Sequence, residues 1–134
     1  MNKREVRTDR APAPVGPYSQ AVVAGGMVYC AGQIALNPST GLMMEGNIAE
    51  ETRRVMDNLG AVLEATGSSF DRVVKTTIYL CDMADFPRVN EVYGSYFGAC
   101  SPARATVQVQ ALPKGAHVEI DCIACVADGD DSGT

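Results

Sequence analysis

Residues 101–126, SPARATVQVQALPKGAHVEIDCIACV, decide the fold, because two alternating segments stand on either side of a short turn-forming stretch. The alternation predicts strands over Ala103–Val109 and Val118–Val126, joined by a loop around Leu112-Pro113-Lys114-Gly115. If helices cover the face that bears Val107 and Ile120, the opposite face is mixed in character. It then carries Arg104, Thr106, Gln108, Glu119, Asp121 and Ile123. A sheet face of this kind is either solvated or buried against another subunit, and we expect the second, in a closed homo-oligomer.

Three earlier segments also have the composition of strands. Tyr18–Ala24 and Met27–Ile34 are separated by Gly25-Gly26, which is typical of a tight hairpin turn. Arg72–Leu80 is β-branched and alternating. On that strand the pattern places Val74, Thr76, Ile78 and Leu80 on one face. One more edge strand is expected near Val6.

Apolar residues at helical spacing predict two helices. The first runs from about Ile48 to Thr66, with Glu50 and Glu51 in its first turn and Gly67 at its left-handed end. Its apolar stripe consists of Val55, Met56, Leu59, Val62 and Leu63. The second begins at Asp85, which is expected to cap it, and ends at Gly98. The order β-β-α-β-α-β-β lets the two helices cover one face of a mixed sheet, which is an α+β architecture.

Length and composition limit the possible functions. A chain of 134 residues forms one domain, 1–134, with a core of about 11–126 and a disordered acidic tail over 128–134. A net charge of −5 and the absence of Trp argue against nucleic acid or anionic membranes as partners. The sequence contains no membrane-length apolar run, and its charged first ten residues are not expected to act as a secretory signal. Its five cysteines are expected to be reduced thiols in a cytoplasmic protein.

The sequence predicts no metal and no cofactor. Cys122 and Cys125 have the spacing of a metal or redox pair, but on a strand their side chains point to opposite faces. The one histidine, His117, is not spaced as a further ligand. Nucleotide-binding and metalloprotease motifs are absent.

Two side chains are the strongest candidates for chemistry. The guanidinium of Arg104 suits a carboxylate or phosphate, but an ion pair with Glu119 or Asp121 is the structural alternative. Strand parity can place Glu119 on the same face as Arg104, where a partly dried carboxylate can activate water. A tight hairpin through Pro113 would set Glu119 opposite Gln108, roughly 13 Å from Arg104.

Three further positions carry weaker signals. Gly16-Pro17 presents Tyr18 at the start of a strand, where the ring either lines a site or packs at its rim. Gly32 allows a ligand to approach the backbone closely, or marks a bulge. Asn90 lies off the apolar stripe of the second helix, on a face that is solvated by default.

Four collinear segments give the chain a family resemblance. They are APAPVGPYSQAV (11–22), AGQIALNPSTG (31–41), VVKTTIYLCDMADFPRVNEVYGSYF (73–97) and SPARATVQVQALPKGAHVEID (101–121). On these segments the chain resembles the reactive intermediate deaminase family, RidA or YjgF, formerly called L-PSP endoribonucleases. The resemblance implies a chorismate-mutase-like fold, a homotrimer with clefts between subunits, and no metal or cofactor.

The same resemblance implies an activity and a set of site residues. The activity is hydrolytic deamination of 2-aminoacrylate- and 2-iminobutyrate-type enamines and imines to 2-oxo acids and ammonia. Arg104 is implied to hold the substrate carboxylate and Glu119 to position or activate water. Tyr18, Gly32 and Asn90 match pocket positions. Two departures bear on substrate preference, since Thr106 stands where some members have Cys and Ala31 replaces the commoner Ser.

Two other functions stay open at the level of sequence. One alternative is a module whose cleft binds 2-oxo acids or other small carboxylates without turnover, because an arginine suits both roles. A ribonuclease or translation inhibitor is a label the family has carried, but the acidic composition and the single histidine argue against it.

Overall fold

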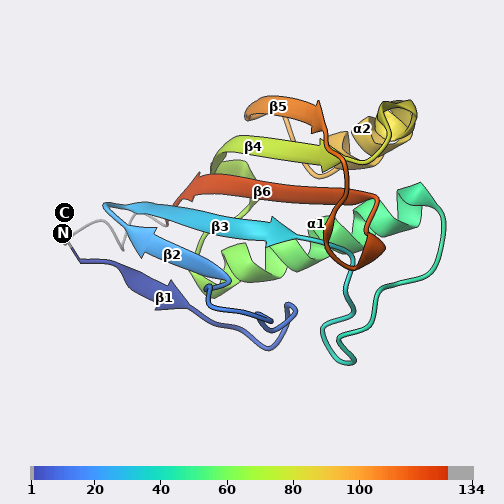
Figure 1. The fold of residues 1–134 in the computed structure, drawn as a ribbon. Helices are drawn as coiled ribbons and strands as arrows, with labels where there is room; N and C mark the ends of the chain where they lie inside the picture. The colour runs from blue at the N-terminus through green and yellow to red at the C-terminus, as the bar shows by residue number, and fades with distance from the viewer. Residues whose placement is uncertain (1, 127–134) are drawn as a thin grey trace.

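A six-stranded mixed sheet runs through the structure, a computed structural model that describes residues 2–126 (Figure 1). The strands are β1 (Arg4–Val6), β2 (Ala21–Ala24), β3 (Met27–Gln33), β4 (Val73–Leu80), β5 (Ala103–Gln108) and β6 (Val118–Cys125). Their order across the sheet is β1-β2-β3-β6-β4-β5, and only β4 and β5 are parallel. The α+β class is confirmed, as is the edge strand near Val6. The predicted tail over 128–134 lies outside the described residues.

Helix α1 (Ile48–Ala65) has well-defined ends. Asn47 accepts a hydrogen bond from the Glu50 N–H while the Glu50 side chain accepts one from the Asn47 N–H, so a capping box begins the helix. Gly67, at φ +81°, ends it in the left-handed conformation, as predicted. The apolar stripe of α1 packs against β3 and β6, behind the sheet in Figure 1.

The second helix differs from its prediction. A 3₁₀ turn over Met83–Asp85 runs directly into α2 (Phe86–Gly94), so Asp85 already has helical backbone angles and its side chain caps nothing. The capping bond comes instead from Asp82, which accepts from the Ala84 N–H at 2.9 Å. Both the Asp85 cap and the end at Gly98 were therefore wrong.

A bulge corrects the predicted faces of β4. The register against β6 shifts between Val73 and Lys75. Val73 is consequently buried, whereas Val74 is 44% exposed and does not share the face of Ile78 and Leu80. The extra residue reverses the side-chain alternation on one side of the bulge.

The hairpin predicted between β5 and β6 does not form. α2 carries the chain across the sheet, and β5 pairs in parallel with the outer side of β4, which itself pairs with β6. Arg104 lies beside Thr76 in the β4–β5 register, and Thr76 is buried beneath α2, with its hydroxyl 2.7 Å from the Tyr93 hydroxyl. Arg104 therefore faces the helices. Its predicted placement on the open face was wrong.

The parallel pairing with β4 also reverses the faces predicted for the other side chains of β5. Thr106 and Gln108 also turn toward the helix layer, while Val107 faces the open side and is 42% exposed. Glu119, Asp121 and Ile123 remain on the open face, as predicted, because their neighbours Val118, Ile120 and Cys122 are buried. Alternation in the sequence shows which side chains of a strand share a face, but the pairing with the neighbouring strand decides whether that face is the helix side or the open side of the sheet.

The described residues include no helix that is both long and apolar enough to cross a membrane.

Leu59, which is 1% exposed beneath the sheet, is predicted to be a main contributor to stability. Leu59→Ala should lower the free energy of unfolding by about 2–5 kcal/mol, because it removes apolar contacts and leaves a cavity. Leu42→Ala, at a side chain that is 69% exposed, should change it by less than about 0.5 kcal/mol. Chemical denaturation at one protomer concentration measures both, and equal losses would contradict the assigned core.

Candidate active site

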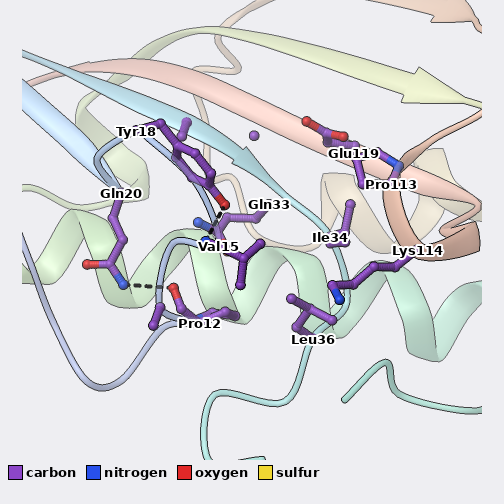
Figure 2. Close-up of a pocket in the computed structure, with 13 residues that line it drawn as sticks. Pro12, Val15, Tyr18, Gln20, Gln33, Ile34, Leu36, Pro113, Lys114 and Glu119 are labelled. Carbon is purple, nitrogen blue, oxygen red and sulfur yellow. Dashed lines mark hydrogen bonds between the residues drawn. The ribbon is translucent and has the colours of Figure 1, made fainter. Parts of the chain in front are cut away.

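A cavity of about 320 Å³ opens beside the end of β3. Its walls come from the segment before β2, from β3 and the residues after it, and from the turn that precedes β6 (Figure 2). Glu119 and Tyr18 lie on opposite sides of this cavity, and Ile34, Leu36 and Val15 supply apolar surface. We call it the Glu119 pocket.

The Glu119 carboxylate rests on the backbone of β3. A Cβ added to Gly32 would overlap Oε2 of Glu119, so a larger residue at position 32 would displace the carboxylate from this position. The register between β3 and β6 shifts between Cys30 and Gln33, which marks a bulge at this point. Gly32 therefore lines the pocket, as expected. The alternative interpretation, that Gly32 marks a bulge, is also correct.

The electrostatics of Glu119 favour a proton-transfer role. Loss of solvation raises the pKa of this carboxyl above its ordinary value, and the negative charge of Asp121 raises it further. No group within residues 2–126 donates a hydrogen bond to the Glu119 carboxylate. The salt-bridge alternative thus finds no partner in the described chain, and the carboxylate is available to a bound molecule.

Tyr18 reaches the pocket from a loop, since β2 begins only at Ala21. The turn at Gly16-Pro17 is present, with the Tyr18 N–H donating to the Gly16 carbonyl at 2.9 Å. The Tyr18 hydroxyl accepts a long hydrogen bond, 3.5 Å, from the Val15 N–H. Its ring stays about half exposed at the cavity rim.

Arg104 occupies a different place, between β5 and α2. Its Nη1 donates to Oδ1 of Asn90 at 2.6 Å. The guanidinium carbon lies 5.3 Å from the centre of the Phe86 ring and 5.1 Å from that of Tyr93. The rings and the amide fix the direction of the fork without neutralising its charge. We call Arg104, Asn90, Phe86 and Thr106 the Arg104 cluster.

Thr106 stands next to Arg104 on the same face of β5. Its hydroxyl oxygen is buried and has no hydrogen-bond partner among the described residues. Asn90, for which solvent exposure was the default expectation, is instead the partner of Arg104. The contact of Phe86 with the guanidinium is a feature that nothing in the sequence indicated.

The structure does not bring Arg104 and Glu119 together within one chain. They lie on opposite faces of the sheet, on strands separated by β4, which places their backbones about 10 Å apart sideways. Arg104 forms no ion pair with any carboxylate of residues 2–126. The internal ion pair with Glu119 or Asp121 is therefore not formed.

The cysteines provide no metal centre in the described chain. Cys122 is buried under the helices, whereas Cys125 lies on the other face, as strand parity predicts. Within residues 2–126, no three His, Cys, Asp or Glu side chains are grouped so that they could hold a metal ion.

These features define a small α+β protein with a carboxylate-lined pocket on one side of its sheet and a stacked, uncompensated arginine on the other. A family model described as Endoribonuclease L-PSP matches residues 8–126, and the chain belongs to that family, the one its sequence resembles.

Individual relatives agree with this assignment. Protein DfrA of Myxococcus xanthus is 54% identical over 126 residues, covering 92% of this chain and 96% of that protein. The mouse 2-iminobutanoate/2-iminopropanoate deaminase is 48% identical over 122 residues, covering 91% of this chain and 90% of that protein. The solved structure of RidA from the Antarctic bacterium Psychrobacter sp. PAMC 21119 superposes with a TM-score of 0.88 at 44% identity, covering 92% of this chain and 99% of that chain.

The raised pKa of Glu119 predicts a pH-dependent cost to stability. The folded chain holds this proton more tightly than the unfolded chain, so folding loses stability as the pH rises through the raised pKa. Glu119→Gln removes that cost. It should raise the thermal unfolding midpoint at pH 7, and the gain should shrink as the pH falls toward about 4, the ordinary pKa of Glu.

The exposed Glu91 on α2 offers the matched control, because Glu91→Gln should leave the midpoint unchanged over the same pH range. A Glu119→Gln gain that does not vary with pH would show that ionisation of Glu119 is not its cause.

Proposed function

We propose that the protein is a cofactor-independent hydrolase that deaminates reactive 2-imino acids and their enamine forms, of the 2-aminoacrylate and 2-iminobutyrate type. The observation that carries this is that one small chain presents both an oriented guanidinium with no ion-pair partner among residues 2–126, at Arg104, and a carboxyl of raised pKa, at Glu119. A relative of 48% identity bearing the name of this activity supports it.

The proposed active form is a homotrimer. The open face of the sheet carries Tyr29, which is 47% exposed, with the partly exposed Ile123 as its strand partner, and Val107 on the edge strand β5. An apolar surface spread across a sheet favours burial against another copy. β5 is an edge strand, so a neighbour packed there can reach both the open face and the Arg104 cluster at its rim.

The proposed cleft is therefore composite. One protomer supplies the Glu119 pocket, with Tyr18 and Gly32, and the adjacent protomer supplies Arg104 with Asn90 and Thr106. This arrangement follows from the placement of the two groups on opposite faces of the sheet, since no single chain can offer both to one small substrate.

The chemistry requires one water and no other reactant. Arg104 holds the substrate carboxylate through its planar fork. Glu119 accepts a proton from water as the water oxygen bonds to C2 of the imine. That proton passes to the imine nitrogen, which gives a carbinolamine. Glu119 then accepts the proton of the new hydroxyl group and delivers it to the amino nitrogen as the C–N bond breaks, so that a 2-oxo acid and ammonia leave. A base whose pKa is raised toward neutrality suits both transfers.

Removal of the Arg104 guanidinium should strongly impair catalysis. A dehydratase that generates 2-aminoacrylate or 2-iminobutyrate in the cuvette provides the substrate, and imine decay is followed with and without the protein. Arg104→Ala should lower kcat/KM by roughly 30- to several-thousand-fold, because loss of a charge-assisted contact costs about 2–5 kcal/mol. Arg53→Ala, at an exposed position on α1, is the control and should retain full activity.

The result also separates the alternatives. Binding of 2-oxo acids without acceleration of imine decay would replace the enzyme with a carboxylate-binding module. RNA cleavage that survives extensive purification and disappears in Arg104→Ala would favour the ribonuclease.

Mixed oligomers test the composite cleft. Arg104→Ala and Glu119→Gln should each be inactive alone. Co-expressed in equal amounts, they should recover about one quarter of the wild-type activity. In a ring, a cleft works only where an intact Glu119 meets an intact Arg104 of the neighbour, which random assembly gives one time in four.

A site contained within one protomer predicts no recovery, because every chain would still carry one lesion. Light scattering of the same samples should give three times the protomer mass of 14.2 kDa, and a monomer that retains activity would contradict the composite cleft.

A further inference from the structure

We infer that two buried polar side chains of α1, Glu51 and Asn58, are positioning residues that hold two neighbouring walls of the Glu119 pocket and thereby fix the Glu119 carboxylate. The inference rests on the proposed hydrolase. Neither side chain touches the cavity, and the sequence indicated only a helix-dipole role for Glu51.

Glu51 holds the wall that precedes β6. It is 4% exposed, although a carboxylate is rarely buried without partners. Its Oε2 accepts from the backbone N–H of His117 at 2.7 Å, and its Oε1 lies 2.9 Å from Nδ1 of the same residue. His117 is two positions before Glu119 and is separated by Ala116 from the turn whose Pro113 and Lys114 line the pocket.

Asn58 holds the wall that follows β3. It is fully buried, and its amide nitrogen donates to the carbonyl of Ile34 at 3.2 Å and to that of Leu36 at 2.9 Å. Ile34 and Leu36 line the pocket immediately after Gly32, on which the Glu119 carboxylate rests.

The spacing of Glu51 and Asn58 along α1 lets both side chains reach the pocket walls from one helix face. Seven residues are almost two helical turns, so Glu51 and Asn58 lie on one stripe of α1, about 10 Å apart. They sit among the apolar residues of that stripe, where an alanine would cost less to bury. One rigid element thus sets the separation of two loops that are 77 residues apart or more in sequence.

A positioning role predicts a particular kinetic signature. Arg104 lies outside this pocket and is unchanged in a Glu51 or Asn58 variant. Such a variant should therefore keep its affinity for the substrate, while the rate of proton transfer falls. Misplacement of a reacting group by about 1 Å can cost on the order of 100-fold in rate. Glu51→Ala should lower kcat by about 10- to 100-fold and change KM by less than about threefold.

The decisive experiment compares Glu51→Ala with Glu51→Gln in the imine-decay assay. Glutamine keeps an acceptor for the His117 N–H, so Glu51→Gln should stay within about threefold of wild type. Amide hydrogen exchange provides a second readout. Glu51→Ala should increase exchange locally over residues 113–118, whereas β4 and α2 should keep their protection.

Two further variants complete the series. Glu64→Ala removes an exposed α1 carboxylate that pairs with Arg10 at 3.1 Å, and it should alter neither kcat nor exchange near His117. Asn58→Asp replaces the amide donor with an acceptor facing two carbonyls, and it should lower kcat while increasing exchange over residues 34–36. If Asn58→Asp fails to fold, the Glu51 series decides alone.

The outcomes separate this inference from the proposed function. Absence of imine hydrolysis in the wild type removes the hydrolase, and the exchange data still decide whether Glu51 fixes residues 113–118. An active wild type with Glu51→Ala at full kcat overturns the positioning role. So does a loss that Glu51→Gln does not rescue, or exchange that rises uniformly across the chain.

Discussion

Parallel pairing between β4 and β5 determines where the charged groups of this protein lie. Because α2 returns the chain to the outer side of β4, β5 meets the sheet with its polar residues toward the helices and Val107 toward the open face. Arg104 is then stacked against two rings of α2, and Glu119, on β6, faces the other way. The separation between cation and carboxylate, and hence the requirement for a second chain in the proposed chemistry, follows from this one strand.

Local signals predicted most of the elements. The Gly25-Gly26 pair has two consecutive left-handed residues, as its hairpin requires, and α1 ends within one residue of its predicted boundary. Such features depend on neighbours in sequence. The Asn47 cap was missed although its signal, Asn three residues before Glu50, was present in the sequence. The bulge at Val74 had no such signal, because it arises from pairing with β6, a strand more than forty residues away.

The structure places the candidate site residues in two separate groups. Arg104, Asn90 and Thr106 do cluster, and Tyr18, Gly32 and Glu119 do share a pocket. The two groups were expected on one face because alternation alone cannot tell whether neighbouring segments in sequence are neighbours in the sheet. Gly32 was expected to admit a ligand. Its missing side chain instead makes room for the carboxylate of Glu119, a contact that only the paired strands can reveal.

The position of β5 at the edge of the sheet exposes a monomer to unwanted association with other chains. Its outer backbone groups lack a neighbouring strand within the described residues, and Ala103, Ala105 and Val107 add small apolar side chains to that border. An exposed edge strand of this kind is a template for pairing with strands of other chains. A newly made monomer is therefore prone to aggregate and, on the scheme proposed above, catalytically inactive. On that scheme, the concentration of the protein has to exceed the concentration at which copies assemble before the proposed imine hydrolysis begins.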